Sequence, residues 1–386
     1  MVSARFPPQQ CGVGDYTYFL SEALGRTGHE VDVLTAVGDL DDSMYPVRSK
    51  VRLRRVITGW ETARLGRIIK RIGEVDADAI VIQYTPHSFD RRGITFAINV
   101  LPTLLRVGRR KRVVTNLHEL FIPFGNNFKH NAAALWQRAG ARLLASGSHA
   151  LSVTTREWER HLRLMGVRKR IELIPVGSNI PRVEVSEEER AQLRQQILGT
   201  SDGVLVAGFG ARHDRDVQAV MGAFSDLKRR VRARLVWIGG EQSQLPPKVV
   251  HSDRANFVEQ GDVEWTGFKP HPVVSRLLRA CDIMLLPFID GVSTRRTSAV
   301  TAFQHGLPLL TTRGSHLEPW FIHGENVYLT PCGDPRALAA GLLELAGAPE
   351  LRSRLAGGGR ALYQKHFAWD VIANQVESLA RGEGEA

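Results

Sequence analysis

Short apolar runs rich in β-branched residues alternate with helical patterns along most of the chain. The first half contains such runs at 30–36, 77–85, 112–118, 150–155 and 171–176. The second half contains them at 204–210, 234–240, 282–288, 307–312 and 326–330. Runs of this length with little polar alternation are typical of buried parallel strands. Their alternation with helices predicts two doubly wound α/β units, with a linker and its flanking helix in the polar segment 183–203.

The start of the chain departs from this pattern. Only "MVSA" precedes the loop "FPPQQCGVGDYT", where a full hydrophobic strand is expected. Either the first strand is very short, or the start lies upstream of Met1.

Composition narrows the class of protein. A chain of 386 residues fits two domains, and its three cysteines are too few and too scattered for a disulfide framework or a zinc site, which fits a reducing cytoplasm. The apolar stretch 94–107 is too short for a membrane span and is broken by Pro102. The formal charge of +11 favours an anionic partner. Nucleic acid is disfavoured because the arginines are spread over turns without interleaved aromatic residues.

Cationic turns follow two strands of the second half. Ligands bind open parallel sheets beyond the carboxyl ends of the strands, where the next helix begins. The turn "IDGVSTRR" after 282–288 supplies backbone N–H groups, hydroxyls and guanidinium groups to such a site, from Gly291, Ser293, Thr294, Arg295 and Arg296. A capped, solvated helix start is the alternative interpretation.

A second turn strengthens the interpretation of the first. "ARHDRDV" follows 204–210 and carries Arg212 and Arg215 directly before a helix. Two cationic turns at one edge of a sheet favour a diphosphate. In the first half, Gly12 and Gly14 open a helix where backbone can approach a ligand closely, although this pattern lacks the third glycine of a dinucleotide site and is more often a plain tight turn.

The order of these motifs resembles retaining glycosyltransferases of the GT-B fold, family 4 type, also called group 1 glycosyltransferases. The resemblance covers essentially the whole chain and rests on "FPPQQCGVGDYTYFLSEALGRTGHEVDVLT", "NLHE", "IELIPVGSN", "FGARHDRDVQAVMGAF", "VEWTGFKPHPVVSRLLRACDIMLLPF", "HGLPLLTT", "HGENVYLTPCGDPRALAAGL" and "FAWDVIANQV". It implies two Rossmann-like parallel-sheet domains, 1–180 and 200–367, that face each other across a cleft. The closing helix, 368–384, would pack back on the first domain.

The resemblance also implies an activity. Such enzymes transfer a sugar, with retention and without a metal or other cofactor, from a nucleotide-diphosphate donor on the second domain. The acceptor, a glycan, a lipid-linked molecule or a small molecule, binds the first domain, where Tyr84, His87 and Asn116 are the expected contacts. Arg215 holds the position of the cation that neutralises the leaving diphosphate. His118 matches the histidine that faces the donor sugar, although a packed histidine at a strand end is the alternative.

One motif departs from the family pattern. Family members commonly carry two glutamates eight positions apart, the second of which holds the ribose hydroxyls. Thr301 stands at the second position, and the first falls at Ser293, or at Asp290 if the turn carries an insertion. We expect weak selection for ribose, and hence tolerance of a dTDP-sugar, unless Glu318 or Asp290 supplies the carboxylate.

Other functions and locations follow from the same residues. A nucleotide-sugar epimerase, or a nucleotide- or glycan-binding protein without catalysis, would also fit a variant donor site. The expected role is cell-envelope or polysaccharide synthesis of bacterial type, in the cytoplasm. The basic stretches 64–73 and 106–114 predict peripheral contact with the inner face of an anionic membrane, against the alternative of a merely solvated basic face.

Overall fold

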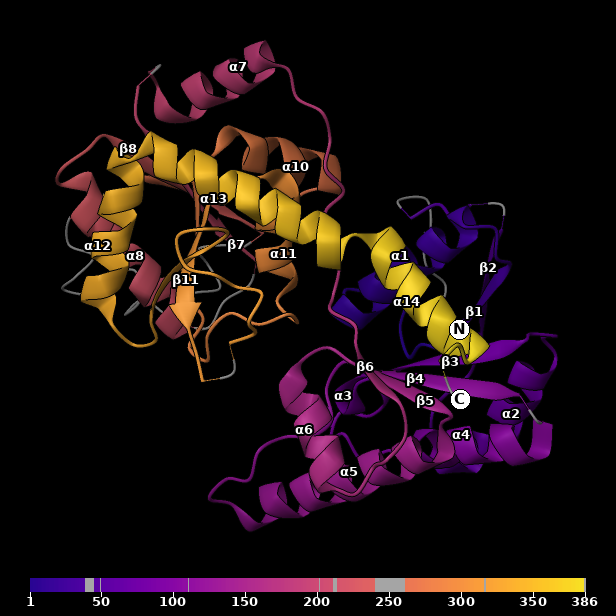
Figure 1. Ribbon diagram of the computed structural model, residues 1–386. Coiled ribbons are helices and arrows are strands. Elements are labelled where there is room, and N and C mark those ends of the chain that lie inside the picture. Colours follow the sequence, from indigo (N-terminus) through magenta and orange to yellow (C-terminus); the bar gives the residue numbers. More distant parts are fainter. Residues whose placement is uncertain are drawn as a thin grey trace. The chain divides into compact units, whose positions relative to one another are not determined.

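The chain folds into two compact α/β units. The computed structural model describes residues 1–38, 45–48, 50–109, 111–200, 202–210, 214–239, 261–315 and 317–384. Unit 1 comprises Met1–Gly177 and Trp369–Ala386, and unit 2 comprises Ser178–Ala368. Each unit contains parallel strands flanked by helices (Figure 1). The prediction of two doubly wound parallel α/β units is therefore confirmed.

The strands of unit 1 are all parallel. They are β1 (Val31–Ala36), β2 (Val51–Ile57), β3 (Ala79–Tyr84), β4 (Arg112–Leu117), β5 (Ala150–Val153) and β6 (Ile171–Leu173). They pair in the orders β1-β2 and β3-β4-β5-β6. Val2 forms bridges to Leu34 on β1 and to Ile82 on β3, so the N-terminal stretch lies between these two strands. Val2 thus takes the place in the sheet where the first strand is expected.

The C-terminal helix belongs to unit 1 and packs on its first helix. Trp369 of α14 (Trp369–Arg381) stacks on Phe19 of α1 (Gly12–Arg26) with ring centroids 5.5 Å apart, and Asp370 pairs with Arg26 at 2.7 Å. The helices of this unit are α1 (Gly12–Arg26), α2 (Leu65–Gly73, after a 3-10 turn at Thr62–Arg64), α3 (Pro86–Phe89), α4 (Phe96–Arg109), α5 (Phe128–Gly147), α6 (Arg156–Leu164) and α14 (Trp369–Arg381).

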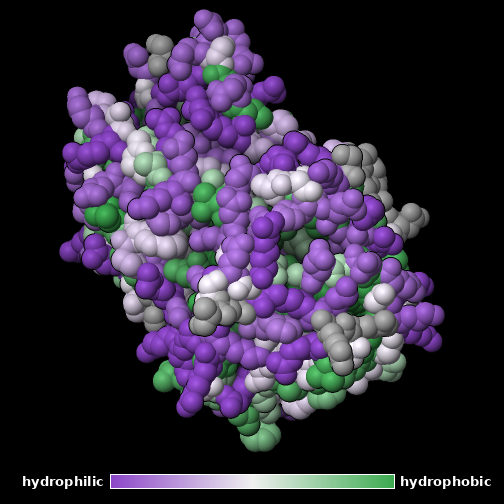
Figure 2. Space-filling model, turned by 45° about the vertical axis from the view of Figure 1, so that its right-hand side comes forward, coloured by the Kyte–Doolittle hydropathy of each residue, from purple (hydrophilic) through white to green (hydrophobic). Residues whose placement is uncertain are grey.

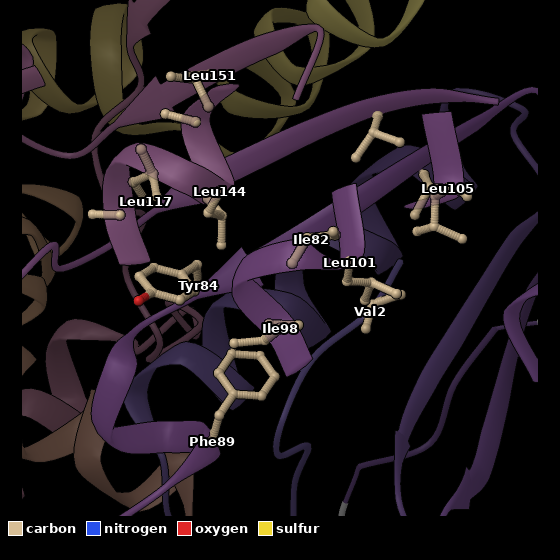
Figure 3. Close-up of a cluster of buried hydrophobic side chains, with 14 of the residues drawn as sticks. Val2, Ile82, Tyr84, Phe89, Ile98, Leu101, Leu105, Leu117, Leu144 and Leu151 are labelled. Carbon is tan, nitrogen blue, oxygen red and sulfur yellow. The ribbon is translucent and has the colours of Figure 1, made fainter. Parts of the chain in front are cut away.

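The core of unit 1 lies between the sheet and helices α4 and α5 (Figure 3). Strand residues Ile82, Leu117 and Leu151 meet Leu101 of α4 and Leu144 of α5, and all five side chains are buried. This burial of apolar surface, at about 25 cal/mol per Å², fixes the inner faces of both helices.

Unit 2 contains a single parallel sheet in the order β12-β11-β10-β7-β8-β9. Its strands are β7 (Val204–Phe209), β8 (Ala233–Ile238), β9 (Val263–Trp265), β10 (Ile283–Leu286), β11 (Leu309–Arg313) and β12 (Tyr328–Pro331). Its helices are α7 (Glu187–Leu198), α8 (Asp214–Lys228), α10 (His271–Ala280), α11 (Thr297–His305), α12 (Pro335–Gly347) and α13 (Pro349–Leu362), the last followed by a π-helical turn at Tyr363–Phe367.

The segment expected to link the domains is part of unit 2. Ser186 and Glu189 form a capping box that starts α7. Arg194 of α7 then reaches the carboxylate of Asp282 at 2.9 Å, just before β10. The polar composition of 183–203 therefore reflects a surface helix anchored to unit 2. Within the described ranges, no helix is long and apolar enough to cross a bilayer.

Candidate functional site

The cationic turn of unit 2 lies where the sequence predicts it. Strand β10 ends at Leu286 and α11 begins at Thr297, so the turn between them lies at the carboxyl edge of the sheet. Strand β10 pairs in parallel with β7, which ends at Phe209. The turns that follow these two strands therefore lie at the same edge.

Backbone contacts hold this turn against the end of β11. Gly291 has φ of 86°, and a Cβ at this position would overlap the backbone of Gly314. The N–H of Val292 donates to the Thr312 carbonyl at 2.9 Å, and the N–H of Phe288 donates to the Thr312 hydroxyl at 2.9 Å. Glycine is required here by both the left-handed backbone and the close approach.

Opposite charges gather within the turn. Asp290 accepts from Arg295 at 3.1 Å and also pairs closely with Arg296. The Arg296 guanidinium lies over the Phe288 ring, 4.6 Å from its centroid. Burial lowers the pKa of Arg296 from its ordinary value, while Asp290 opposes this shift. Arg296 is thus a cation held against an aromatic ring, and it is not a side chain that extends into solvent.

The same turn retains hydrogen-bonding capacity. In the part of the chain that the structure describes, neither the buried Ser293 hydroxyl nor the buried Arg296 Nε–H has a hydrogen-bond partner. Buried donors without partners are costly, so such groups are commonly satisfied by a ligand or water. A hydroxyl and a guanidinium N–H are suited to a phosphate oxygen.

The second predicted turn lies largely outside the described residues. Arg212 is among the residues not described, and Arg215 lies in α8 with its side chain likewise outside the description. Asp216, the next residue of α8, is buried and is close enough to Arg296 to affect its pKa. The roles predicted for Arg212 and Arg215 stay predictions.

Thr301 is a structural residue in this fold. It is fully buried, and its hydroxyl donates to the Thr297 carbonyl at 2.9 Å and lies 3.0 Å from the Ser178 hydroxyl. The one proton of this hydroxyl is committed to Thr297, and complete burial keeps the hydroxyl away from any ribose. Thr294 and Glu318 are also buried.

A second polar cluster lies at the carboxyl edge of the unit 1 sheet. His118 follows β4 directly, and its Nε2 lies 2.9 Å from the Oε1 of Gln83 on β3. Because an amide oxygen only accepts, the His118 Nε2–H is the donor and Nδ1 carries the lone pair. The Gln83 oxygen also accepts from Asn116 at 3.4 Å, and Asn116 accepts from Ser152 of β5 at 2.6 Å.

This cluster is uncharged. Burial lowers the pKa of His118 from 6.5 to about 4, so the imidazole is neutral at physiological pH. Tyr16 of α1 meets the His118 ring edge-on, with centroids 4.6 Å apart. Among the described residues, the buried Nε2 of Gln83 has no hydrogen-bond partner. The cluster can therefore offer neutral donors and acceptors to a hydroxyl-rich ligand.

The other residues predicted for the site in unit 1 lie in different environments. A Cβ at Gly14 would make a tight contact, 3.3 Å from the Arg5 carbonyl oxygen, whereas Gly12 has open space. Asn116 belongs to the polar cluster, but Tyr84 is a core residue that stacks on Phe89 (Figure 3). His87 is exposed on α3 and lies 3.3 Å from the Arg91 carbonyl. The structure thus gives Tyr84 a packing role.

Sequence reasoning missed Gln83. It lies inside a run that the pattern identifies only as a buried strand, and it is itself fully buried. A buried polar residue in an apolar strand was the available signal, because such a group requires a partner. Among the described residues, no group of three or more His, Cys, Asp or Glu side chains is placed to hold a metal ion.

Two solved structures share this fold along nearly the whole chain. Sucrose-phosphate synthase from Thermosynechococcus elongatus has a TM-score of 0.76 and 20% identity, covering 99% of this chain and 97% of that one. The Anabaena HepE protein in complex with UDP-glucose has a TM-score of 0.69 and 16% identity, covering 99% and 98%. Two Rossmann-like units with these neighbours define the GT-B fold.

The family models match each unit separately. The model described as a glycosyl transferase 4-like domain matches residues 11–177, and the model described as glycosyl transferases group 1 matches residues 201–347. The chain belongs to the group 1 glycosyltransferases. It is 28% identical over 154 residues to the amylovoran biosynthesis glycosyltransferase AmsK of Erwinia amylovora. That match covers 38% of this chain and 37% of the relative, so the chain spans well under half of that protein.

Proposed function

We propose that this chain transfers a sugar from a nucleotide-diphosphate sugar to a hydroxyl of a glycan or lipid-linked acceptor in polysaccharide synthesis. A small-molecule acceptor is the remaining alternative. The bond from the anomeric carbon to the diphosphate breaks, a bond to the acceptor oxygen forms, and the hydroxyl proton leaves with the diphosphate. Membership of the family and the AmsK similarity support this proposal.

The observation that carries the proposal is the turn of unit 2. Arg295, Arg296 and the Ser293 hydroxyl lie at the carboxyl edge of a parallel sheet, and two buried donors there lack a partner in the described chain. This arrangement suits the diphosphate of the donor, whose charge increases as the sugar leaves. Arg215 is expected to add a second cation from α8.

Unit 1 would receive the sugar and the acceptor. The neutral cluster of Gln83, Asn116 and His118 offers hydrogen bonds without a charge, which suits sugar hydroxyls. In this assignment His118 binds the donor sugar, and its low pKa excludes a protonated acid at neutral pH. The expectation that the two units face each other across a cleft is part of the proposal.

The donor base is proposed from a neighbour. HepE is a solved structure in complex with UDP-glucose, so UDP-sugars are the first donors to test. The buried Thr301 removes one reason to expect tolerance of a dTDP-sugar, although that tolerance stays a prediction. Retention and metal independence are also proposed here, the latter because arginines can neutralise the diphosphate.

Incubation with UDP-, GDP- and dTDP-sugars, with and without a panel of free and lipid-linked glycans, tests the function. We expect release of the nucleoside diphosphate with a product that keeps the anomeric configuration, and equal turnover in EDTA. An epimerised free sugar would assign the chain to epimerases, and binding without turnover would indicate a binding protein. Loss of turnover in EDTA with rescue by manganese would contradict metal independence alone.

A further inference from the structure

Helix α5 carries a row of apolar side chains on its outer face. Phe128, Leu135, Trp136 and Leu143 are 86%, 62%, 42% and 38% exposed. Their spacing of seven, eight and fifteen residues from Phe128 places them on one side of an α-helix. The opposite side of α5 supplies Leu144 to the core. An apolar row of this kind on the surface indicates a partner.

Helix α4 extends this apolar surface. Phe96 and Val107 are 44% and 70% exposed. A Cβ at Gly140 of α5 would overlap the Asn99 side chain of α4, so the two helices are in direct contact and their outer faces adjoin. In Figure 2, hydrophobic surface gathers along the lower edge of the view, at the height of α4 and α5 in Figure 1.

The charge of this region has one sign. Helices α4 and α5 together contain five lysines and arginines and no acidic residue. Lys129 and Arg142 are exposed on α5 beside the apolar row. Aromatic and aliphatic side chains flanked by cations, with few acids, are typical of helices that lie in the interface of a bilayer.

We propose that the outer face of α4 and α5 is a docking surface for an anionic lipid bilayer. Phe128, Trp136 and Leu143 enter the boundary between headgroups and acyl chains, and Lys129 and Arg142 reach lipid phosphates. A second copy of the chain fits this surface less well, because a symmetric contact would bring two cationic faces together.

The structure distinguishes this surface from the one that the sequence predicts at 64–73. On α2, Ile68 and Ile72 are buried in the core, so the helix presents no apolar row to a bilayer. Arg71 also pairs with Glu74 at 3.0 Å. The α4–α5 face combines exposed apolar side chains with cations, and both contribute to membrane binding, whereas α2 offers cations alone. This inference does not depend on transferase activity, because it is tested without any sugar.

Flotation with phosphatidylcholine vesicles containing about one third phosphatidylglycerol, at about physiological salt, tests the proposal. The full chain should float with these vesicles and much less with phosphatidylcholine alone. We expect the double variant Phe128→Ala, Trp136→Ala to lower the partition coefficient about tenfold or more, and Lys129→Glu, Arg142→Glu to do the same. Phe268→Ala is the matched control, because Phe268 is a 62% exposed aromatic residue of unit 2.

Thermal unfolding confirms that each variant is folded before its binding is compared. The proposal is overturned if the wild type does not float, or if both α5 variants float as well as the wild type. Loss of flotation only in Arg67→Glu, Lys70→Glu would assign docking to α2 instead. A dimer that forms without lipid and is broken by Phe128→Ala, Trp136→Ala would assign the surface to a second copy.

Discussion

The two units present the same kind of sheet edge, but the edge of unit 1 is neutral and that of unit 2 is charged. In unit 1 the edge holds a neutral cluster in which His118 donates to Gln83. In unit 2 the edge holds Asp290 between two arginines. Both edges follow parallel strands and both contain buried donors without a partner in the described chain. The difference shows how one fold supplies hydrogen bonds for a sugar in one unit and charge for a phosphate in the other.

The charged edge gives the largest expected effect. Arg296→Ala should lower kcat/KM for a nucleotide sugar by about 10²-fold or more, because it removes a preorganised cation from the developing charge. Arg229→Ala is the control, since Arg229 is exposed beyond the far end of α8. Steady-state kinetics of purified, folded variants provide the measurement. Equal and small effects in both variants would place the diphosphate elsewhere.

Acid should destabilise unit 2 through a histidine outside the turn. Burial lowers the pKa of His305 from 6.5 to about 4, while its bond to the Thr301 carbonyl opposes the shift. The unfolded chain therefore binds the proton more readily. The contribution of His305 to the free energy of unfolding is fully present above pH 6.5 and is lost as pH falls toward 4.

His305→Gln should make the unfolding free energy less dependent on pH in that window, by up to about 1.4 kcal/mol per pH unit. Urea unfolding of both proteins between pH 4 and 7 measures this slope, with His87→Gln, an exposed histidine, as the control. Identical slopes in His305→Gln and the wild type would contradict the assignment of a low pKa to His305.

Activity should depend on the presence of His118 in unit 1, but it should not depend on the protonation of His118 near neutral pH. His118→Ala should lower kcat/KM about tenfold, because a neutral hydrogen bond contributes less than a cation. Because the pKa of His118 is about 4, the wild-type pH profile should show no step from this group between pH 5.5 and 8. A step near pH 6.5 that disappears in His118→Ala would mean that the pKa of His118 is not lowered, which would contradict this account.

Thr301 should matter for stability more than for the donor. Thr301→Val removes the hydroxyl that bonds the Thr297 carbonyl and meets Ser178, so the unfolding free energy should fall by about 1 kcal/mol. The ratio of kcat/KM for matched UDP- and dTDP-sugars should not change. A change of that ratio by tenfold or more would show that Thr301 contributes to donor recognition, contrary to this prediction.

The sequence predicts the fold well because the spacing of apolar residues along each strand or helix shows which of its residues are buried. The apolar runs correspond to the central strands, whereas β2 was missed because "VRLRRVI" alternates charge with apolar residues and is only partly buried. Strand β9 was missed because it has three residues. Short or half-exposed strands lack the continuous apolar run on which the prediction depends.

The candidate site was predictable only in part. His118 follows β4 directly, and Arg295 and Arg296 lie in the turn between β10 and α11, so their place at a sheet edge follows from the pattern. The burial of Thr301 and Tyr84, and the bond from His118 to Gln83, depend on packing between segments far apart in sequence. A single sequence gives the face of a residue within its element, but it does not give the depth of that residue in the fold.

Affinity for UDP tests the comparison most directly. Isothermal titration of the wild type, Arg296→Ala and His118→Ala with UDP separates the two edges, because UDP carries the diphosphate without the sugar. We predict that Arg296→Ala weakens UDP binding about tenfold or more, while His118→Ala binds UDP as the wild type does. Unchanged binding in Arg296→Ala, or an equal loss in His118→Ala, would contradict the assignment of the diphosphate to unit 2.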